Sequence, residues 1–173
     1  MPSAPVPARL PDLSSAGWRA VRIAAAATVA LALAAGTVMA APGGAKVLDA
    51  SLVAEPASQV NQTLFGVTAG GLPWHLDHGS VQLFANGRIH LEVQGLVLAA
   101  GGAAGTNPIP AGQAILTCAG APAAASSIVP FSAAGDATIN ETLALPASCL
   151  APTVFFAGVP APNVARWFAV SGW

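Results

Sequence analysis

Apolar and polar residues alternate in short segments from residue 47 onward, and clusters of glycine and proline separate these segments. Alternation with a period of two is typical of half-buried strands, and no segment here keeps the longer apolar period of a helix. We therefore expect an all-β fold, an antiparallel β-sandwich of immunoglobulin-like or Greek-key type with about 7–9 short strands. The expected strands are 47–54, 63–68, 80–84, 88–98, 114–119, 127–131, 136–145, 153–157 and 165–172.

Two of the separating segments carry expectations of their own. Residues 101–110 contain glycines without the spacing of a nucleotide-binding motif, so we expect a flexible loop there. Residues 120–125 are also expected to form a loop, and the alanines at 123–125 are the one place where the sequence permits a helical turn.

The Asn86-Gly87 step predicts a hairpin between two expected strands. A two-residue loop would set Leu83 opposite His90 and mix apolar with charged side chains on both faces. A three-residue loop instead pairs Leu83 with Ile89, and it leaves one apolar face and one polar face. We therefore predict the three-residue loop, with Gly87 in a left-handed conformation.

The first part of the chain has the pattern of an export signal. An unbroken run of small and apolar residues, 23–40, follows three arginines and ends in Val38-Met39-Ala40. A basic segment, an apolar core and small residues before the cleavage position are the three parts of a secretory signal peptide. The alternative is an uncleaved helix that anchors the protein, because the apolar run is about as long as a bilayer crossing requires.

This signal sets the expected organisation of the chain. We expect a secreted or envelope-associated protein that has no membrane contact after cleavage, with one domain large enough to bury a core. The expected parts are a helical signal peptide at 1–40, a flexible mature N-terminus at 41–46 and a single β-sandwich domain at 47–173.

Charged residues are sparse, at 8% of the chain, and the net charge is −1. Beyond the expected cleavage site the cations are Lys46, Arg88 and Arg166, which are dispersed along the sequence. A nucleic-acid-binding surface needs clustered cations that neutralise phosphates. The composition therefore excludes nucleic acid as a partner and leaves an unknown envelope or extracellular partner as the expectation.

Cys118 and Cys149 are the two cysteines of the chain. In an exported protein, an even pair most simply forms one disulfide. Chain-entropy arguments predict that closing a loop of about thirty residues stabilises the fold by roughly 3–4 kcal/mol. The alternative, a redox or metal pair, lacks the C-x-x-C spacing typical of such sites.

His75, Asp77 and His78 combine side chains that bind zinc. The predicted hairpin sets His90 opposite Gln82, which separates His90 from His78 by about 13 Å along the sheet. The two imidazoles cannot share an ion if the strand is straight. A local loop site made by His75, Asp77 and His78 alone is the alternative. We expect instead a polar loop that enters a strand, with neither a metal nor a cofactor.

Catalytic motifs are absent from the sequence, which has no nucleophile elbow of the G-x-S-x-G type. Among the carboxylates, Glu141 has the unusual position. Ile139 and Leu143 share its side of the expected strand, so an unbroken strand would bury it. We expect a bulge that turns Glu141 outward; a buried functional carboxylate is the alternative.

Trp74 and Trp167 suggest ligand binding, because their large flat side chains supply contact area for a sugar or a partner, as Trp173 also would. Tryptophan also fills cores, and the chain has no tyrosine to extend an aromatic surface. We assign no catalytic residue. The candidate binding residues are Trp74, His75, Asp77, His78, Glu141 and Trp167.

Several short motifs follow one another between residues 79 and 157. They are Gly79-Ser80-Val81, Asn86-Gly87, Leu91-Glu92-Val93-Gln94-Gly95-Leu96-Val97, Asn107-Pro108, Cys118, Pro130-Phe131-Ser132, Gly135-Asp136-Ala137, Leu145-Pro146, Cys149 and Ala151-Pro152. This order resembles that of small, alanine-rich secreted β proteins of unknown function from high-GC Gram-positive bacteria. The resemblance implies export, the β class and the cysteine pair, and it transfers no site.

Two classes of function agree with these features. The first is a secreted or envelope-associated, non-catalytic β module that binds a partner or has a structural role. The alternative is a small secreted hydrolase or metal-dependent enzyme. Sparse charge and the lack of a convergent polar set favour the non-catalytic module.

Overall fold

The computed structural model describes residues 44–161 and 164–172, so the expected leader, residues 41–43 and Trp173 lie outside the described part. The regular structure of this part consists of strands and one 3-10 turn, and the all-β class is confirmed. The described segments include no helix long and apolar enough to cross a membrane. The elements are β1 (Lys46–Ala54), the 3-10 turn η1 (Ala57–Gln59), β2 (Thr63–Leu64), β3 (Val67–Thr68), β4 (Trp74–His75), β5 (His78–Phe84), β6 (Arg88–Gln94), β7 (Val97–Leu98), β8 (Ala111–Cys118), β9 (Ala121–Ala125), β10 (Val129–Pro130), β11 (Ala137–Thr142), β12 (Thr153–Ala161) and β13 (Val164–Ser171).

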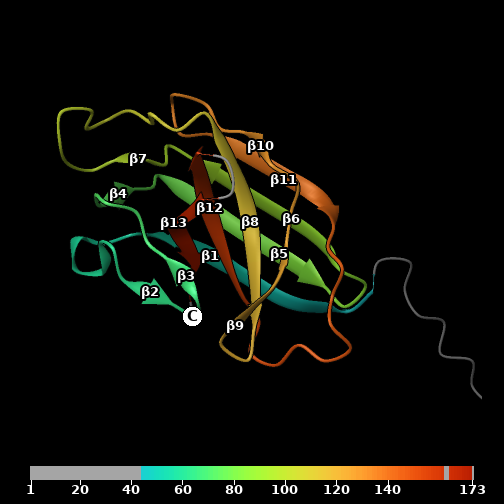
Figure 1. Ribbon diagram of the computed structural model, residues 1–173. Coiled ribbons are helices and arrows are strands. Elements are labelled where there is room, and N and C mark those ends of the chain that lie inside the picture. The colour runs from blue at the N-terminus through green and yellow to red at the C-terminus, as the bar shows by residue number, and fades with distance from the viewer. Residues whose placement is uncertain (1–43, 162–163, 173) are drawn as a thin grey trace, which may run out of the picture. The chain divides into compact units, whose positions relative to one another are not determined.

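The principal sheet forms two packed layers that share strand β1 (Figure 1). Its strand order is β10-β8-β12-β13-β1-β5-β6-β11, with β9 paired to β8, and every ladder is antiparallel. The first part of β1 pairs with β5 as far as Ser51, and from Leu52 onward β1 pairs with β13. The chain therefore passes from the back layer (β5, β6, β11) to the front layer (β8, β12, β13) within a single strand.

The main core lies between these two layers. In β5 and β6 every second side chain is buried, as the alternation predicts. Leu83 pairs with Ile89, and Gly87 has a φ of 87°, so the predicted hairpin register is confirmed. The front layer contributes Phe156 and Phe168 to the same core.

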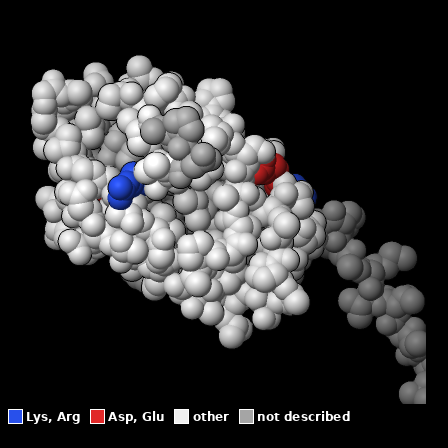
Figure 2. Space-filling model, in the orientation of Figure 1, with Lys and Arg blue, Asp and Glu red and all other residues white. Residues whose placement is uncertain are grey.

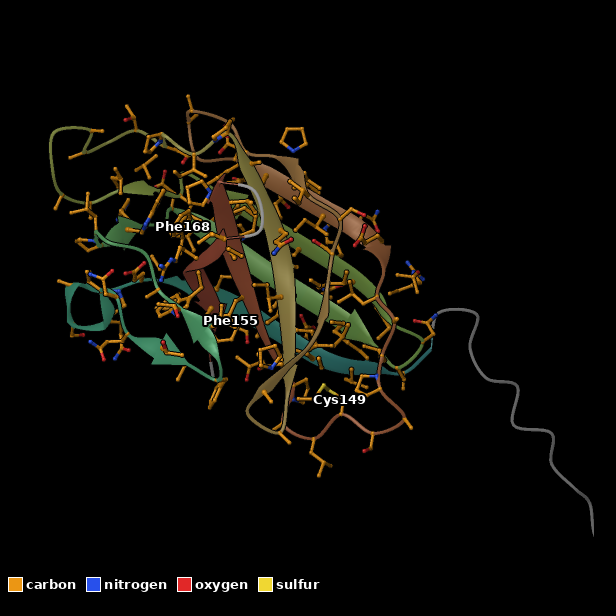
Figure 3. The ribbon with its side chains drawn as sticks, viewed as in Figure 1. Cys149, Phe155 and Phe168 are labelled. Carbon is orange, nitrogen blue, oxygen red and sulfur yellow. A yellow bond between two sulfur atoms is a disulfide. The ribbon has the colours of Figure 1, made fainter. Side chains whose placement is uncertain are left out.

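A second, smaller core lies on the outer face of the front layer. Phe155 and Trp167, each next in sequence to a residue of the main core, pack there against Val67 and Ala69. In Figure 3, Phe155 lies beside the β2–β3 hairpin, and Phe168 lies farther from this hairpin. The hairpin belongs to residues 56–73, which we call the flap because they cover this outer face.

The strand predicted at 63–68 is wrong in detail, because the segment folds into a hairpin. Phe65 and Gly66 have φ values of 50° and 80°, the left-handed pair that a two-residue turn requires. Thr63 consequently pairs with Thr68. The strand predicted at 88–98 is also interrupted, at Gly95, whose φ is 63°.

The loop predicted at 120–125 is wrong as well, and residues 123–125, where the sequence permits a helical turn, are extended. Residues 121–125 form β9, which pairs along the edge of β8. Pro122 is compatible with such an edge strand because it needs no partner for a backbone N–H. Short alanine side chains carry little preference of their own, so the free edge of β8 determines the extended conformation here.

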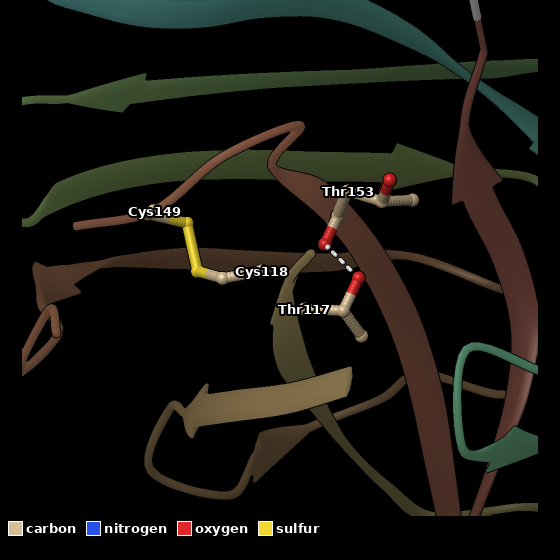
Figure 4. Close-up of a disulfide and its surroundings, with 4 residues drawn as sticks. All are labelled: Thr117, Cys118, Cys149 and Thr153. Carbon is tan, nitrogen blue, oxygen red and sulfur yellow. Dashed lines mark hydrogen bonds between the residues drawn. A yellow bond between two sulfur atoms is a disulfide. The ribbon is translucent and has the colours of Figure 1, made fainter. Parts of the chain in front are cut away.

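The predicted disulfide between Cys118 and Cys149 is confirmed, with Cα atoms 4.9 Å apart and a sequence separation of 31 (Figure 4). Beside it, the Thr117 hydroxyl donates to the Thr153 carbonyl at 3.3 Å. The bridge therefore ties the end of β8 to the long connection between β11 and β12.

Candidate functional site

His75, Asp77, His78 and His90 do not converge on one point in the described structure. His75 Nε2 and Asp77 Oδ1 form an exposed pair at 3.0 Å. His78 lies opposite Gln94, and His90 lies opposite Gln82, as the register predicts. Among the described residues, no group of three potential metal ligands comes together.

Glu141 does not sit on a bulge, so that expectation is wrong. It pairs with Ile89 in an uninterrupted β6–β11 ladder and is half-buried. Its Oε1 accepts a hydrogen bond of 2.8 Å from the backbone N–H of Ser127. Because β11 is an edge strand, the Glu141 carboxylate can face inward and still reach the segment before β10. Glu141 therefore has a structural role.

Both candidate tryptophans are buried rather than displayed on the surface. Trp74 is 6% exposed and Trp167 is 1% exposed. Trp74 stacks on Phe168 with 3.9 Å between ring centroids. Each indole nevertheless forms part of the wall of a cleft, Trp167 on the outer face and Trp74 at one end of the layers.

Glu55 is the residue that sequence analysis missed. Its side chain is fully buried; Oε2 accepts a hydrogen bond of 2.9 Å from the Gly70 N–H, while Oε1 has no partner among the described residues. Burial raises the pKa of Glu55 from 4.5 to about 7, and the Gly70 N–H opposes this shift only in part. A sequence signal existed, since Glu55 is an isolated charge between β1 and a long uncharged segment.

Glu55 ties both ends of the flap to the sheet. Its backbone N–H donates to the Phe168 carbonyl, and its carbonyl accepts from the Trp74 N–H, at 2.8 and 2.9 Å. Gly70 N–H also approaches the Trp167 carbonyl at 3.2 Å. The flap thus leaves the sheet directly after Glu55 and returns to it at Gly70. The Glu55–Gly70 contact therefore fixes the flap, which borders the two clefts described next.

The first cleft, which we call the outer cleft, has a volume of about 340 Å³. The paired residues Ile115, Phe155, Val170 and Val53 form an apolar row across four strands of the outer face. The flap covers the first two of these residues, whereas Val53 is 54% exposed. The outer cleft lies at this open end of the row. It is lined by Ser51, Val53, Ala54, Pro56, Gln59, Leu64, Phe65, Thr153, Trp167, Val170, Ser171 and Gly172.

The second cleft, which we call the arginine cleft, has a volume of about 280 Å³. It lies where the end of the flap meets β4, β7 and the strands β12 and β13. Its lining is apolar except for one cation, that of Arg166. The lining residues are Gly70, Gly71, Leu72, Trp74, Leu98, Pro108, Ile109, Pro160, Arg166 and Phe168.

The surface around these features carries few charges. In Figure 2 most of the visible face is uncharged; one cationic group stands alone, and an acidic group lies beside a second cationic group at the edge of the view. Acid–base catalysis needs titratable groups that converge on one site. Among the described residues, neither cleft brings two such groups together.

No protein-family model matches the chain, and no curated protein or solved structure matches it either. The chemistry of the two clefts therefore carries the functional assignment.

Proposed function

We propose that this protein is an exported, disulfide-stabilised and non-catalytic β module that binds a small, uncharged, largely apolar ligand in the outer cleft. The pattern of residues 1–40 supports export. The Cys118–Cys149 disulfide agrees with an oxidising compartment, where such bonds persist.

The observation that carries the binding role is the lining of the outer cleft, which includes no ionisable side chain. A charged ligand would lose its hydration there without gaining a counter-charge. Aliphatic and aromatic side chains make up most of the walls, and the polar side-chain groups are hydroxyls, one amide and the indole N–H of Trp167. The volume of about 340 Å³ lies in the range of small-molecule sites.

The experiment that tests this role is a fluorescence titration with the neutral apolar dye N-phenylnaphthylamine. Val53→Asp places a carboxylate on the floor of the cleft, whereas Val47→Asp makes the same change at a 45% exposed valine of β1 outside this cleft. We expect saturable binding in the wild type and in Val47→Asp. In Val53→Asp the dye should bind at least about tenfold more weakly.

Two results would count against the outer cleft. One is the lack of saturable dye binding to wild-type protein, and the other is equal loss of affinity in both valine variants. Melting temperatures measured for all three proteins control for unfolding, because both variants replace surface residues and should stay folded.

A further inference from the structure

Arg166 differs from the other described cations, because no described carboxylate or aromatic ring is recorded as a partner for its charge. Lys46 forms an ion pair with Asp49 at 2.7 Å, and the Arg88 guanidinium lies 5.3 Å from the centroid of the Phe84 ring. No described carboxylate comes within 4.0 Å of Arg166, although this side chain is half-buried in the wall of the arginine cleft. A partly desolvated guanidinium without a counter-ion favours an anionic ligand.

The rest of the arginine cleft is suited to an apolar body. The stacked rings of Trp74 and Phe168 form one wall, and Leu98 and Ile109 form part of the remainder. The position of Phe168 is closely defined, because a side chain at Gly158 would collide with its ring and one at Gly70 would crowd it. The aromatic wall is therefore held in place before any ligand arrives.

We propose that the arginine cleft is a second ligand site, which binds a small amphipathic monoanion such as a medium-chain carboxylate. The carboxylate pairs with the planar guanidinium of Arg166, and the apolar chain lies along Trp74 and Phe168. This site is independent of the outer cleft, since Arg166 and Val53 line different cavities.

Charge and size favour a single small anion over a polyanion or a membrane surface. One cation lines the cleft, whereas a phosphate-rich polymer needs several spaced cations. Attraction to an anionic membrane also depends on clustered lysine or arginine residues. A volume of about 280 Å³ accommodates one short chain and its head group.

The test is calorimetric titration of the full chain with decanoate, decanol and decylammonium, each below the concentration at which it forms micelles. We expect decanoate to bind more tightly than decanol and decylammonium to bind most weakly. Arg166→Gln should weaken decanoate at least about tenfold and leave decanol nearly unchanged, because only the charge is removed. Arg88→Gln removes the same charge outside the cleft and should bind decanoate as the wild type does.

Further variants and a vesicle arm separate the alternatives. Arg166→Lys keeps the charge without the planar fork and should recover part of the decanoate affinity. Val53→Asp should leave decanoate binding intact, which distinguishes this site from the outer cleft. Equal affinities for decanoate in Arg166→Gln and Arg88→Gln would overturn the proposal. Binding to anionic phospholipid vesicles without any binding of soluble decanoate would overturn it as well.

Discussion

Glu55 is a carboxyl group that the fold keeps away from water, so its ionisation is linked to stability. Its pKa is about 7 in the folded protein, against 4.5 without burial. Between these values the folded state holds a proton that the unfolded state has released. The free energy of unfolding therefore falls as pH rises through this window, by roughly 3 kcal/mol in all.

The charged groups around Glu55 do not alter this sign. The flap contains no titratable residue, and Arg166 on β13, His75 on β4 and Asp49 on β1 are not among the causes of the pKa shift. Ionised Glu55 is therefore stabilised mainly by the Gly70 N–H. Since desolvation of the buried charge outweighs the gain from this bond, ionisation destabilises the fold at the point where the flap is anchored.

Glu55→Gln is predicted to abolish most of this pH dependence. The variant should match the wild type near pH 4.5 and exceed its stability above pH 7, because glutamine can accept from the Gly70 N–H without carrying a buried charge. Urea unfolding at several pH values across the window measures the difference. Glu92→Gln, on the polar face of β6, should keep the wild-type slope; a persistent slope in Glu55→Gln would contradict the assignment.

Gly87 is a second position where one residue controls local structure. Its φ of 87° is left-handed, and an added Cβ would collide with the carbonyl oxygen of Leu143. Two other glycines separate these effects: Gly105 is left-handed with open space around it, and Gly102 has open space without a left-handed φ.

The three alanine variants should form a graded series in urea unfolding. Gly102→Ala is expected to be nearly neutral, and Gly105→Ala should cost about 1 kcal/mol for the left-handed backbone. Gly87→Ala should cost more than about 2 kcal/mol, because the collision adds to the backbone strain. Equal losses in Gly87→Ala and Gly105→Ala would mean that the hairpin moves aside at little cost.

At the scale of the elements, the disulfide joins the end of β8 to the connection before β12, beside the Thr117–Thr153 pair of the β8–β12 ladder. Replacing Cys118 and Cys149 by serine should lower stability by roughly 3–4 kcal/mol and the melting temperature by on the order of 10–20 °C. Thr117→Val, which removes only the neighbouring hydrogen bond, should cost about 1 kcal/mol. Calorimetry measures all three proteins, and an unchanged melting temperature in the serine variant would contradict a stabilising role.

The sequence predicted an element correctly where the pattern of neighbouring residues is enough to define it. The β5–β6 register depends on alternation and on one turn, both visible within a few residues. The break after β6 is different, because the Gly95 N–H donates to Asp136, a residue 41 positions away. Strand β9 likewise depends on the edge of β8 rather than on its own alanines.

On the scale of the whole molecule, export is the prediction that the described residues leave open. Secreted protein should begin at or near Ala41, as intact mass would reveal. Ala40→Leu should block cleavage, because the position before the cut requires a small residue, whereas Ala45→Leu should be processed normally. Secreted wild-type protein that retains residues 1–40 would contradict the signal peptide.

The sequence by itself determined the β class, the hairpin register and the cysteine pair. These features depend on a residue's immediate neighbours or on a count of two cysteines, so no knowledge of distant contacts was needed. It also identified Trp74 and Trp167, although not their burial in two different cores. Aromatic side chains suit a core and a binding surface equally well, and only their neighbours in space distinguish the two.

Only the tertiary structure decided how the layers join and where the candidate sites lie. The passage of β1 between layers brings Glu55 beneath the flap, and the β12–β13 pairing brings Arg166 to the cleft that Trp74 and Phe168 line. Burial, an unusual pKa and an unpaired cation arise from contacts between segments far apart in sequence. Such contacts leave no periodic pattern along the chain, because each depends on the packing of the other segments.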